Sequence, residues 1–189
     1  MLSMLFYPFK YLGISWESPN SSRNQKLWID LYLPLIVSSF SFLVWWRFGV
    51  EHSPYFFNST AFDVIINFLQ TLPGFYLAAL AVIASFNNGF LDELTYGEGP
   101  IDTNNEEMSR RRFLTNCVSY LAVLSMFLIG LSSCIKYLDQ INVLGSFAVE
   151  YRPILYGLCI SLFVFLLVQL FFITLLCLYY LGDRLHRAN

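Results

Sequence analysis

The stretch that decides the fold is FDVIINFLQTLPGFYLAALAVIASF, residues 62–86, an apolar run long enough to cross a bilayer as a helix. Polar and small residues recur in it every three or four positions, so they share one helical face. We call this face the polar seam; it consists of Asp63, Asn67, Gln70, Gly74, Ala78, Ala81 and Ser85. An unpaired amide or carboxyl is costly in hydrocarbon, so we expect the seam to meet protein or water, at the centre of a bundle or an oligomer.

Two arrangements of the seam remain open from the sequence. If it faces inward within one protomer, Asn67 and Gln70 would hydrogen-bond to polar residues of the later helices, such as Thr115, Ser119 or Gln169. If it faces an oligomer axis, the two amides would ring a narrow path that favours cations. Structural helix pairing is the leading interpretation, and the water-lined path is the alternative.

The composition places the whole chain in a membrane. Hydrophobic residues make up 57% of the 189 residues and charged residues only 13%, about half the usual share in soluble domains. A soluble domain of this length could not bury so much apolar surface. The net charge of -2 gives no reason to expect direct binding of nucleic acid.

Four spanning helices are predicted, at about residues 27–46, 62–86, 113–135 and 153–181. An aromatic N-terminal segment, residues 1–16, suits the headgroup layer and lacks the pattern of a secretory signal. We therefore predict an all-α, polytopic membrane protein that forms a single domain over residues 1–189: a four-transmembrane-helix bundle with an N-terminal interfacial segment. Gly157 and Ser161 in the last helix offer a small-residue contact surface for the seam.

Positive charge predicts the orientation. Eight of the eleven Lys and Arg residues fall in the N-terminal stretch, the loop 87–112 and the tail, and three fall in the two other loops. By the positive-inside rule, both termini and the loop 87–112 are cytoplasmic. The chain is thus predicted to cross its membrane several times.

In the cytoplasmic loop 87–112, the acidic residues come first and the basic residues follow. Its acidic part could dock a soluble partner, or could simply be solvated; the docking candidates are Asp92, Glu93, Glu106 and Glu107. A triple basic run next to the third span is typical of a topology signal that also binds anionic lipid headgroups; it consists of Arg110, Arg111 and Arg112.

The search for chemistry is mostly negative. The sequence has no phosphate-binding loop, zinc-protease motif, nucleophile elbow or dinucleotide turn, so we expect no enzyme and no cofactor. The four cysteines all fall in predicted spans; depth would permit pairs between Cys117 and Cys177 and between Cys134 and Cys159, but buried free thiols are favoured. Two histidines on opposite sides give little support to a metal site.

The segment LPGFYLAALAVIASF at 72–86, followed by SRRRFL at 109–114, resembles stretches of small four-span membrane subunits from bacterial phage-defence systems. The architecture is most similar to the membrane subunit of the Kiwa system, and next to the membrane effector of certain retrons. The Kiwa resemblance implies a non-enzymatic sensor and anchor in the bacterial inner membrane, which forms a homo-oligomer and holds a cytoplasmic, DNA-binding partner at the inner face. The alternative is a pore-forming effector that depolarises the infected cell.

Overall fold

Four membrane-spanning helices dominate the computed structural model, which describes residues 7–16, 24–49, 56–85, 89–92, 94, 100–102, 106–141 and 151–183. The helices long and apolar enough to cross a membrane are Trp28–Phe48, Thr60–Ser85, Arg110–Gln140 and Pro153–Leu181. Each lies within five residues of the position predicted from the sequence. The protein is therefore an all-α, four-helix membrane bundle, as predicted.

The first span is one continuous helix built from α3 (Asn24–Leu27), the π-helical turn η2 (Trp28–Tyr32), α4 (Leu33–Val44) and the π-helical turn η3 (Trp45–Gly49). The other spans are α5 (Thr60–Ser85), α7 (Arg110–Gln140) and α9 (Arg152–Asp183). Short elements lie before and between them: η1 (Tyr7–Phe9), α2 (Lys10–Gly13), β1 (Ser15–Trp16), α6 (Gly89–Asp92) and β2 (Pro100–Ile101).

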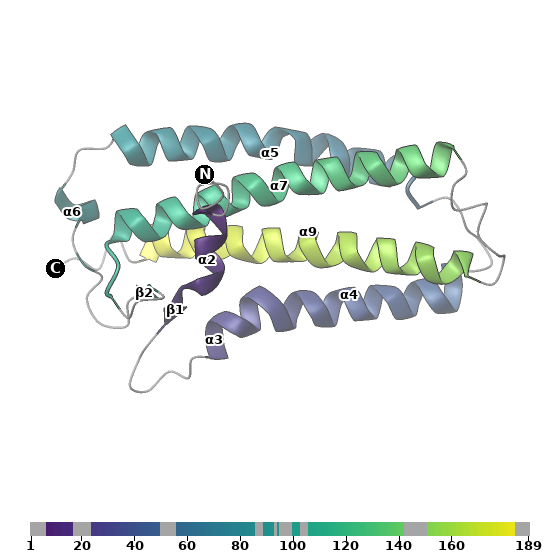
Figure 1. The fold of residues 1–189 in the computed structure, drawn as a ribbon, viewed down its shortest axis with the longest axis horizontal. Helices are drawn as coiled ribbons and strands as arrows, with labels where there is room; N and C mark the ends of the chain where they lie inside the picture. Colours follow the sequence, from purple (N-terminus) through teal and green to yellow (C-terminus); the bar gives the residue numbers. More distant parts are fainter. Residues whose placement is uncertain are drawn as a thin grey trace.

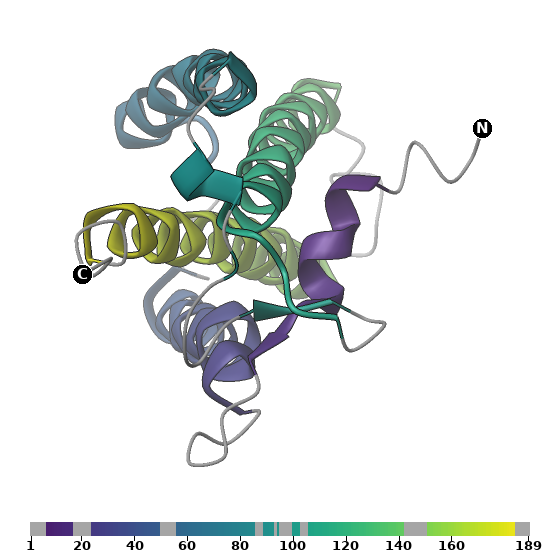
Figure 2. The ribbon, with the colours of Figure 1, turned by 90° about the vertical axis from the view of Figure 1, so that its left-hand side faces the viewer.

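The spanning helices form a row in the order α5, α7, α9, α4 (Figure 1). Helix α5 packs against α7, α7 against α9, and α9 against α4. The end view in Figure 2 shows α5 and α4 at opposite margins of the bundle, with α7 and α9 between them. Helix α5 also reaches α9 through side chains, because the Tyr76 hydroxyl lies 2.8 Å from that of Thr174.

The central helix of the protomer is α7 rather than the seam helix α5. Half of the most apolar part of α7 is buried, against 11% for α5. The expectation that residues 62–86 occupy the centre therefore fails for one protomer. The reason is that α7 has neighbours on two sides, α5 and α9, whereas α5 contributes only a narrow line of buried residues, Phe62, Leu69 and Tyr76.

A glycine allows the close approach of α4 and α9. A Cβ atom added at Gly157 would lie 2.9 Å from ring carbons of Phe42 and Trp45. One turn further, the Ser161 hydroxyl donates a hydrogen bond of 3.3 Å to the Ser38 carbonyl. The small-residue pair predicted in the last helix is thus a contact surface, but it meets the first span and not the seam.

A proline and a glutamine join the first span to α9. Pro34 has no N–H to donate to the carbonyl of Asp30, four residues earlier. The Gln169 side chain donates to that carbonyl instead, at 3.2 Å. In hydrocarbon a carbonyl released by proline needs such a replacement donor, so Gln169 stabilises this helix start.

The N-terminal elements fold onto the bundle end where α7 begins and α9 ends. We call residues 7–16, which comprise η1, α2 and β1, the strap. Its strand β1 pairs antiparallel with β2 of the loop 87–112, and its helical part packs on α7 (Figures 1 and 2). Tyr11 and Ile14 are buried there, whereas Tyr7, Phe9 and Leu12 are exposed. The strap is thus packed on the bundle through two side chains and leaves three apolar side chains exposed.

Candidate functional site

All seven residues of the polar seam are exposed on the outer face of α5. At 3.6 residues per turn, the seam is centred about 140° around the helix from the buried line Phe62, Leu69 and Tyr76. The seam therefore faces away from the protomer's own core. It does not meet the later helices, as the inward arrangement would require.

The seam amides have no partner within the described part of the protomer. Asn67 and Gln70 are exposed and make no hydrogen bond to another described residue. Of their expected partners, Gln169 is bonded to the Asp30 carbonyl, and Thr115 and Ser119 are half-buried on α7 without a bond to the seam. Nothing in the described part of the chain therefore covers the two amides.

The acid at the end of the seam is neutralised within the chain. Asp63 accepts a hydrogen bond from Lys136 of α7, and the two side chains form an ion pair. Nearby, Asp139 of α7 accepts from Asn58 at 2.7 Å and from the Tyr156 hydroxyl. The charge of Asp63 that would mark the mouth of a cation path is thus largely balanced.

The loop 87–112 is tied to the bundle by its own opposite charges. Arg111 binds both oxygens of Asp92, at 2.7 and 3.1 Å, and donates to the Ile83 carbonyl at 3.0 Å. Arg112 pairs with the buried Asp102, and Arg110 is itself buried. Of the three arginines, Arg110 is buried, Arg111 is half-buried and Arg112 is exposed, and upstream acids pair with Arg111 and Arg112.

The proposed docking acids fall into different situations. Asp92 is occupied by Arg111, so it stabilises the loop. Glu106 and Glu107 are exposed and lie just before Ser109, whose hydroxyl accepts from the Arg112 N–H at the start of α7. Glu93 lies outside the described residues. A partner could therefore reach Glu106 and Glu107 without breaking an ion pair.

A buried ion pair that the sequence reading missed holds the strap. The Lys26 ammonium donates to the carbonyls of Tyr11 and Ile14, at 2.6 and 2.7 Å, and lies 3.5 Å from Asp30. The Tyr11 hydroxyl donates to Asp30 at 3.0 Å and its ring stacks on Tyr120. The four-residue spacing of Lys26 and Asp30 was a visible signal, but the strap carbonyls that complete the cluster could not be located from the sequence.

Burial shifts the pKa values of Lys26 and Tyr11, the two members of this cluster that lie outside the spans. It lowers the pKa of Lys26 from its ordinary value, and the neighbouring Asp30 charge opposes that shift. Burial, aided by the Asp30 charge, raises the pKa of Tyr11 well above the ordinary tyrosine value. The cluster is a buried, fully hydrogen-bonded group in a position where unpaired charge would be costly.

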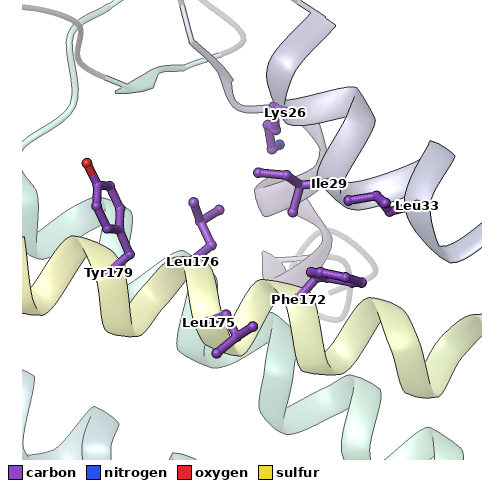
Figure 3. A pocket seen from close by; sticks show the side chains of 7 residues that line it. All are labelled: Lys26, Ile29, Leu33, Phe172, Leu175, Leu176 and Tyr179. Carbon is purple, nitrogen blue, oxygen red and sulfur yellow. The ribbon is translucent and has the colours of Figure 1, made fainter.

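A pocket of about 440 Å³ separates the first span from α9 near this cluster (Figure 3). Its walls are apolar except for Lys26 and Tyr179; the other lining residues are Ile29, Leu33, Phe172, Leu175 and Leu176. The Lys26 ammonium is engaged by the strap, so the pocket offers no free catalytic group among these residues.

The four cysteines are free. Cys117 and Cys177 are buried as neighbours between α7 and α9, whereas Cys134 is exposed. Within the described residues, no group of three His, Cys, Asp or Glu side chains could hold a metal ion. Comparisons with protein-family models, with curated proteins and with solved structures found no match.

Proposed function

We propose that this chain is a non-enzymatic membrane sensor and anchor that self-associates through the polar seam of α5 and recruits a cytoplasmic partner. The observation that carries the proposal is the exposed, unpartnered pair of amides on the outer face of a spanning helix. The bacterial inner membrane and the antiphage role, with a DNA-binding partner, rest on the sequence likeness to phage-defence subunits.

A second copy of the chain is the occupant that suits the seam best. Each amide carries both a donor and an acceptor, so Asn67 and Gln70 can pair with the same residues of a second α5. Such interhelical hydrogen bonds contribute about 1 kcal/mol each in membranes. Lipid tails can offer neither donor nor acceptor, so they leave both amides unsatisfied.

The small residues of the seam permit the close contact that amide pairing needs. A Cβ added at Gly74 would have no described atom within 4 Å, so the backbone of α5 is open to a neighbour there. Gly74 and Ala78 are four residues apart and form a small-xxx-small pair next to Gln70. Two α5 helices could therefore cross near Gly74 with the amides on one side of the crossing.

The cytoplasmic end supplies a preformed surface for the partner. The described part of the loop is held by the pair Arg111–Asp92, by Arg112–Asp102 and by the β1–β2 contact with the strap. Glu106 and Glu107 project from this fixed framework. A rigid acidic surface loses little entropy on binding, which favours a basic patch on the partner.

The test is the oligomeric mass of the purified full-length chain in nanodiscs, measured by light scattering. We expect Gly74→Ile to lower the oligomeric mass, because the side chain blocks the crossing while leaving the protomer intact. The matched control is Gly130→Ile, since Gly130 of α7 is also exposed and open for 4 Å. A monomeric native chain, or an equal effect of both changes, would reject self-association through the seam.

The recruitment of a partner is tested with the same purified native chain and variants. A cytoplasmic protein that copurifies with the native chain should be lost from the double variant Glu106→Gln and Glu107→Gln. It should be retained by Gly130→Ile. Retention by the double variant would show that these acids do not dock the partner.

The second candidate, a pore-forming effector, is favoured by the same outward seam, since four helices in a row enclose no pore of their own. In an oligomer, Asn67 and Gln70 could line a path along the axis. Asp63 would lie at the mouth of this path, and its pairing with Lys136 weakens the preference of the mouth for cations. Replacing both amides by Leu separates the candidates. Ion flux from liposomes that this change abolishes favours the pore, and absence of flux in the native chain favours the anchor.

A further inference from the structure

We propose that the cavity beneath the strap binds the head group of a zwitterionic phospholipid from the leaflet on the strap side. The cavity has a volume of about 680 Å³, within the range of small-molecule sites. Its wall is formed by strap residues 12–15, by the start of the first span, and by Tyr120, Phe165 and Gln169. This site is separate from the seam of α5, which contributes no lining residue among those described.

The cavity is polar inside and apolar at its margin. Lys26, Asp30, Tyr120 and Gln169 are all at most 7% exposed and form the inner surface. Three leucines at the margin are between 42% and 49% exposed: Leu12, Leu27 and Leu31. A ligand that fits this order places its polar group inward and its tails toward the bilayer, which is the order of a phospholipid entering sideways.

The position of the cavity along the membrane normal suits a lipid head group. Lys26 and Leu27 directly precede the first span, which begins at Trp28, and Asp30 is its third residue. The cavity therefore opens at the boundary between the hydrocarbon and the headgroup layer, where aromatic residues such as Trp28 commonly lie. A water-soluble metabolite would have to cross the exposed leucines to enter.

The charges of the inner surface select a zwitterion. Among the described lining residues, Lys26 and Asp30 are the charged ones, and they lie 3.5 Å apart with a net charge of zero. An anionic head group would bring an unbalanced charge into a buried site, at a large cost. Lys10, the cation of the strap, is exposed and stacks on Tyr7 instead of lining the cavity.

A primary ammonium is preferred over a quaternary one because the Asp30 carboxylate can accept hydrogen bonds from it. A head group with both charges can place its ammonium toward Asp30, whose carboxylate has lone pairs left beside its contacts with Tyr11 and Lys26. Its phosphate then lies toward the amide of Gln169 and the hydroxyl of Tyr120, because the three donors of Lys26 are already used. The ethanolamine ammonium can donate hydrogen bonds to the carboxylate, whereas the methylated choline head has no N–H. One charge-assisted hydrogen bond corresponds to about a tenfold difference in affinity.

The experiment measures which lipids stay bound to the full-length chain. Nanodiscs are prepared with equimolar phosphatidylethanolamine, phosphatidylcholine and phosphatidylglycerol, and lipids retained after release are counted per protomer by native mass spectrometry. We expect one retained phosphatidylethanolamine per protomer, enriched about tenfold over each of the other lipids. Enrichment of phosphatidylglycerol, or equal retention of all three as an annular lipid only, would overturn the proposal.

Two substitutions on one helix provide the control. Leu31→Trp fills the margin of the cavity and should abolish the retained lipid. Leu35, one turn further, is 48% exposed against 42% for Leu31 and does not line this cavity, so Leu35→Trp should leave retention unchanged. Asp30→Asn leaves a net positive inner surface and should shift the preference toward phosphatidylglycerol. Unchanged retention in Leu31→Trp would place the bound lipid elsewhere, whatever the outcome at the seam of α5.

Discussion

At the scale of single residues, two glycines in similar sequence surroundings have opposite roles. Gly157 lies against the rings of Phe42 and Trp45, whereas Gly130 has open space around it. Alanine is a better helix former than glycine by about 1 kcal/mol, so an added methyl stabilises a helix wherever there is room for it. Where there is no room, overpacking costs about 1–3 kcal/mol.

We therefore expect the two Gly→Ala changes to shift stability in opposite directions. Gly157→Ala should lower the free energy of unfolding by up to about 2 kcal/mol, because the cost of overpacking exceeds the gain in helix propensity. Gly130→Ala should raise it by up to about 1 kcal/mol. Equilibrium unfolding of both variants in the same detergent gives the comparison. A stabilised Gly157→Ala would mean that α4 and α9 are less closely packed than the structure has them.

The sequence identified small and polar residues correctly as contact residues but could not assign their partners. Gly157 and Ser161 were expected to meet the seam, and they meet the first span. Gln169 was a candidate partner for the seam, and it donates to Asp30. Periodicity tells which face a residue occupies, while the neighbour of that face depends on the order of helices in the row.

At the scale of elements, the spans were predictable to within a few residues, and the ends depend on local contacts. Helix α7 begins at Arg110, three residues before the predicted start, because Ser109 caps it and Asp92 and Asp102 balance its arginines. Neither ion pair could be inferred from spacing, since each joins residues at least ten positions apart. The packed strap was likewise not evident from its short aromatic sequence.

The strap should loosen at high pH because of Tyr11. Its pKa is raised in the folded strap, so above the ordinary tyrosine value of about 10 the folded state retains a proton that the released strap loses. The stabilisation is therefore complete below pH 10 and is lost as the pH rises. Lys26 has a lowered pKa, so its contribution to the stability of the folded strap has the opposite sign. That contribution is complete above the ordinary lysine pKa and is lost as the pH falls below it.

A spin label at the exposed position Leu12 measures this release, in a chain whose exposed Cys134 is replaced by alanine. Between pH 9 and pH 11, the mobile fraction of the label should increase in the chain with Tyr11. In Tyr11→Phe the strap should be looser at every pH but should lack this increase, while the contribution of Lys26 is common to both chains. Parallel pH profiles in the two chains would contradict the role of the Tyr11 proton.

At the scale of the whole molecule, an open row of helices explains why the seam is exposed. In a closed bundle, the fourth helix would cover α5, whereas here α5 and α4 lie at opposite margins (Figure 2). Hydropathy could predict that the seam avoids lipid, but it could not tell a neighbouring helix from a neighbouring protomer. That distinction depends on helix order, which the composition of the spans does not specify.

The orientation of the row across the membrane is predicted from charge alone and is open to direct measurement. Eight of the eleven Lys and Arg residues belong to the N-terminal stretch before the first span, to the loop 87–112 and to the tail, so this end should be cytoplasmic. Two exposed positions mark the two ends: Glu107 precedes α7, and Ile141 directly follows it. Both can carry single cysteines in a chain whose four native cysteines are replaced by alanine.

In intact cells, a membrane-impermeant maleimide should label Ile141→Cys and leave Glu107→Cys unlabelled. After the cells are opened, both should react, which shows that the protected position is accessible and only lies on the other side. Labelling of Glu107→Cys in intact cells would invert the orientation. It would then place Glu106, Glu107 and the strap outside the cytoplasm, so a cytoplasmic partner could not reach them, while the seam could still join two copies within the bilayer.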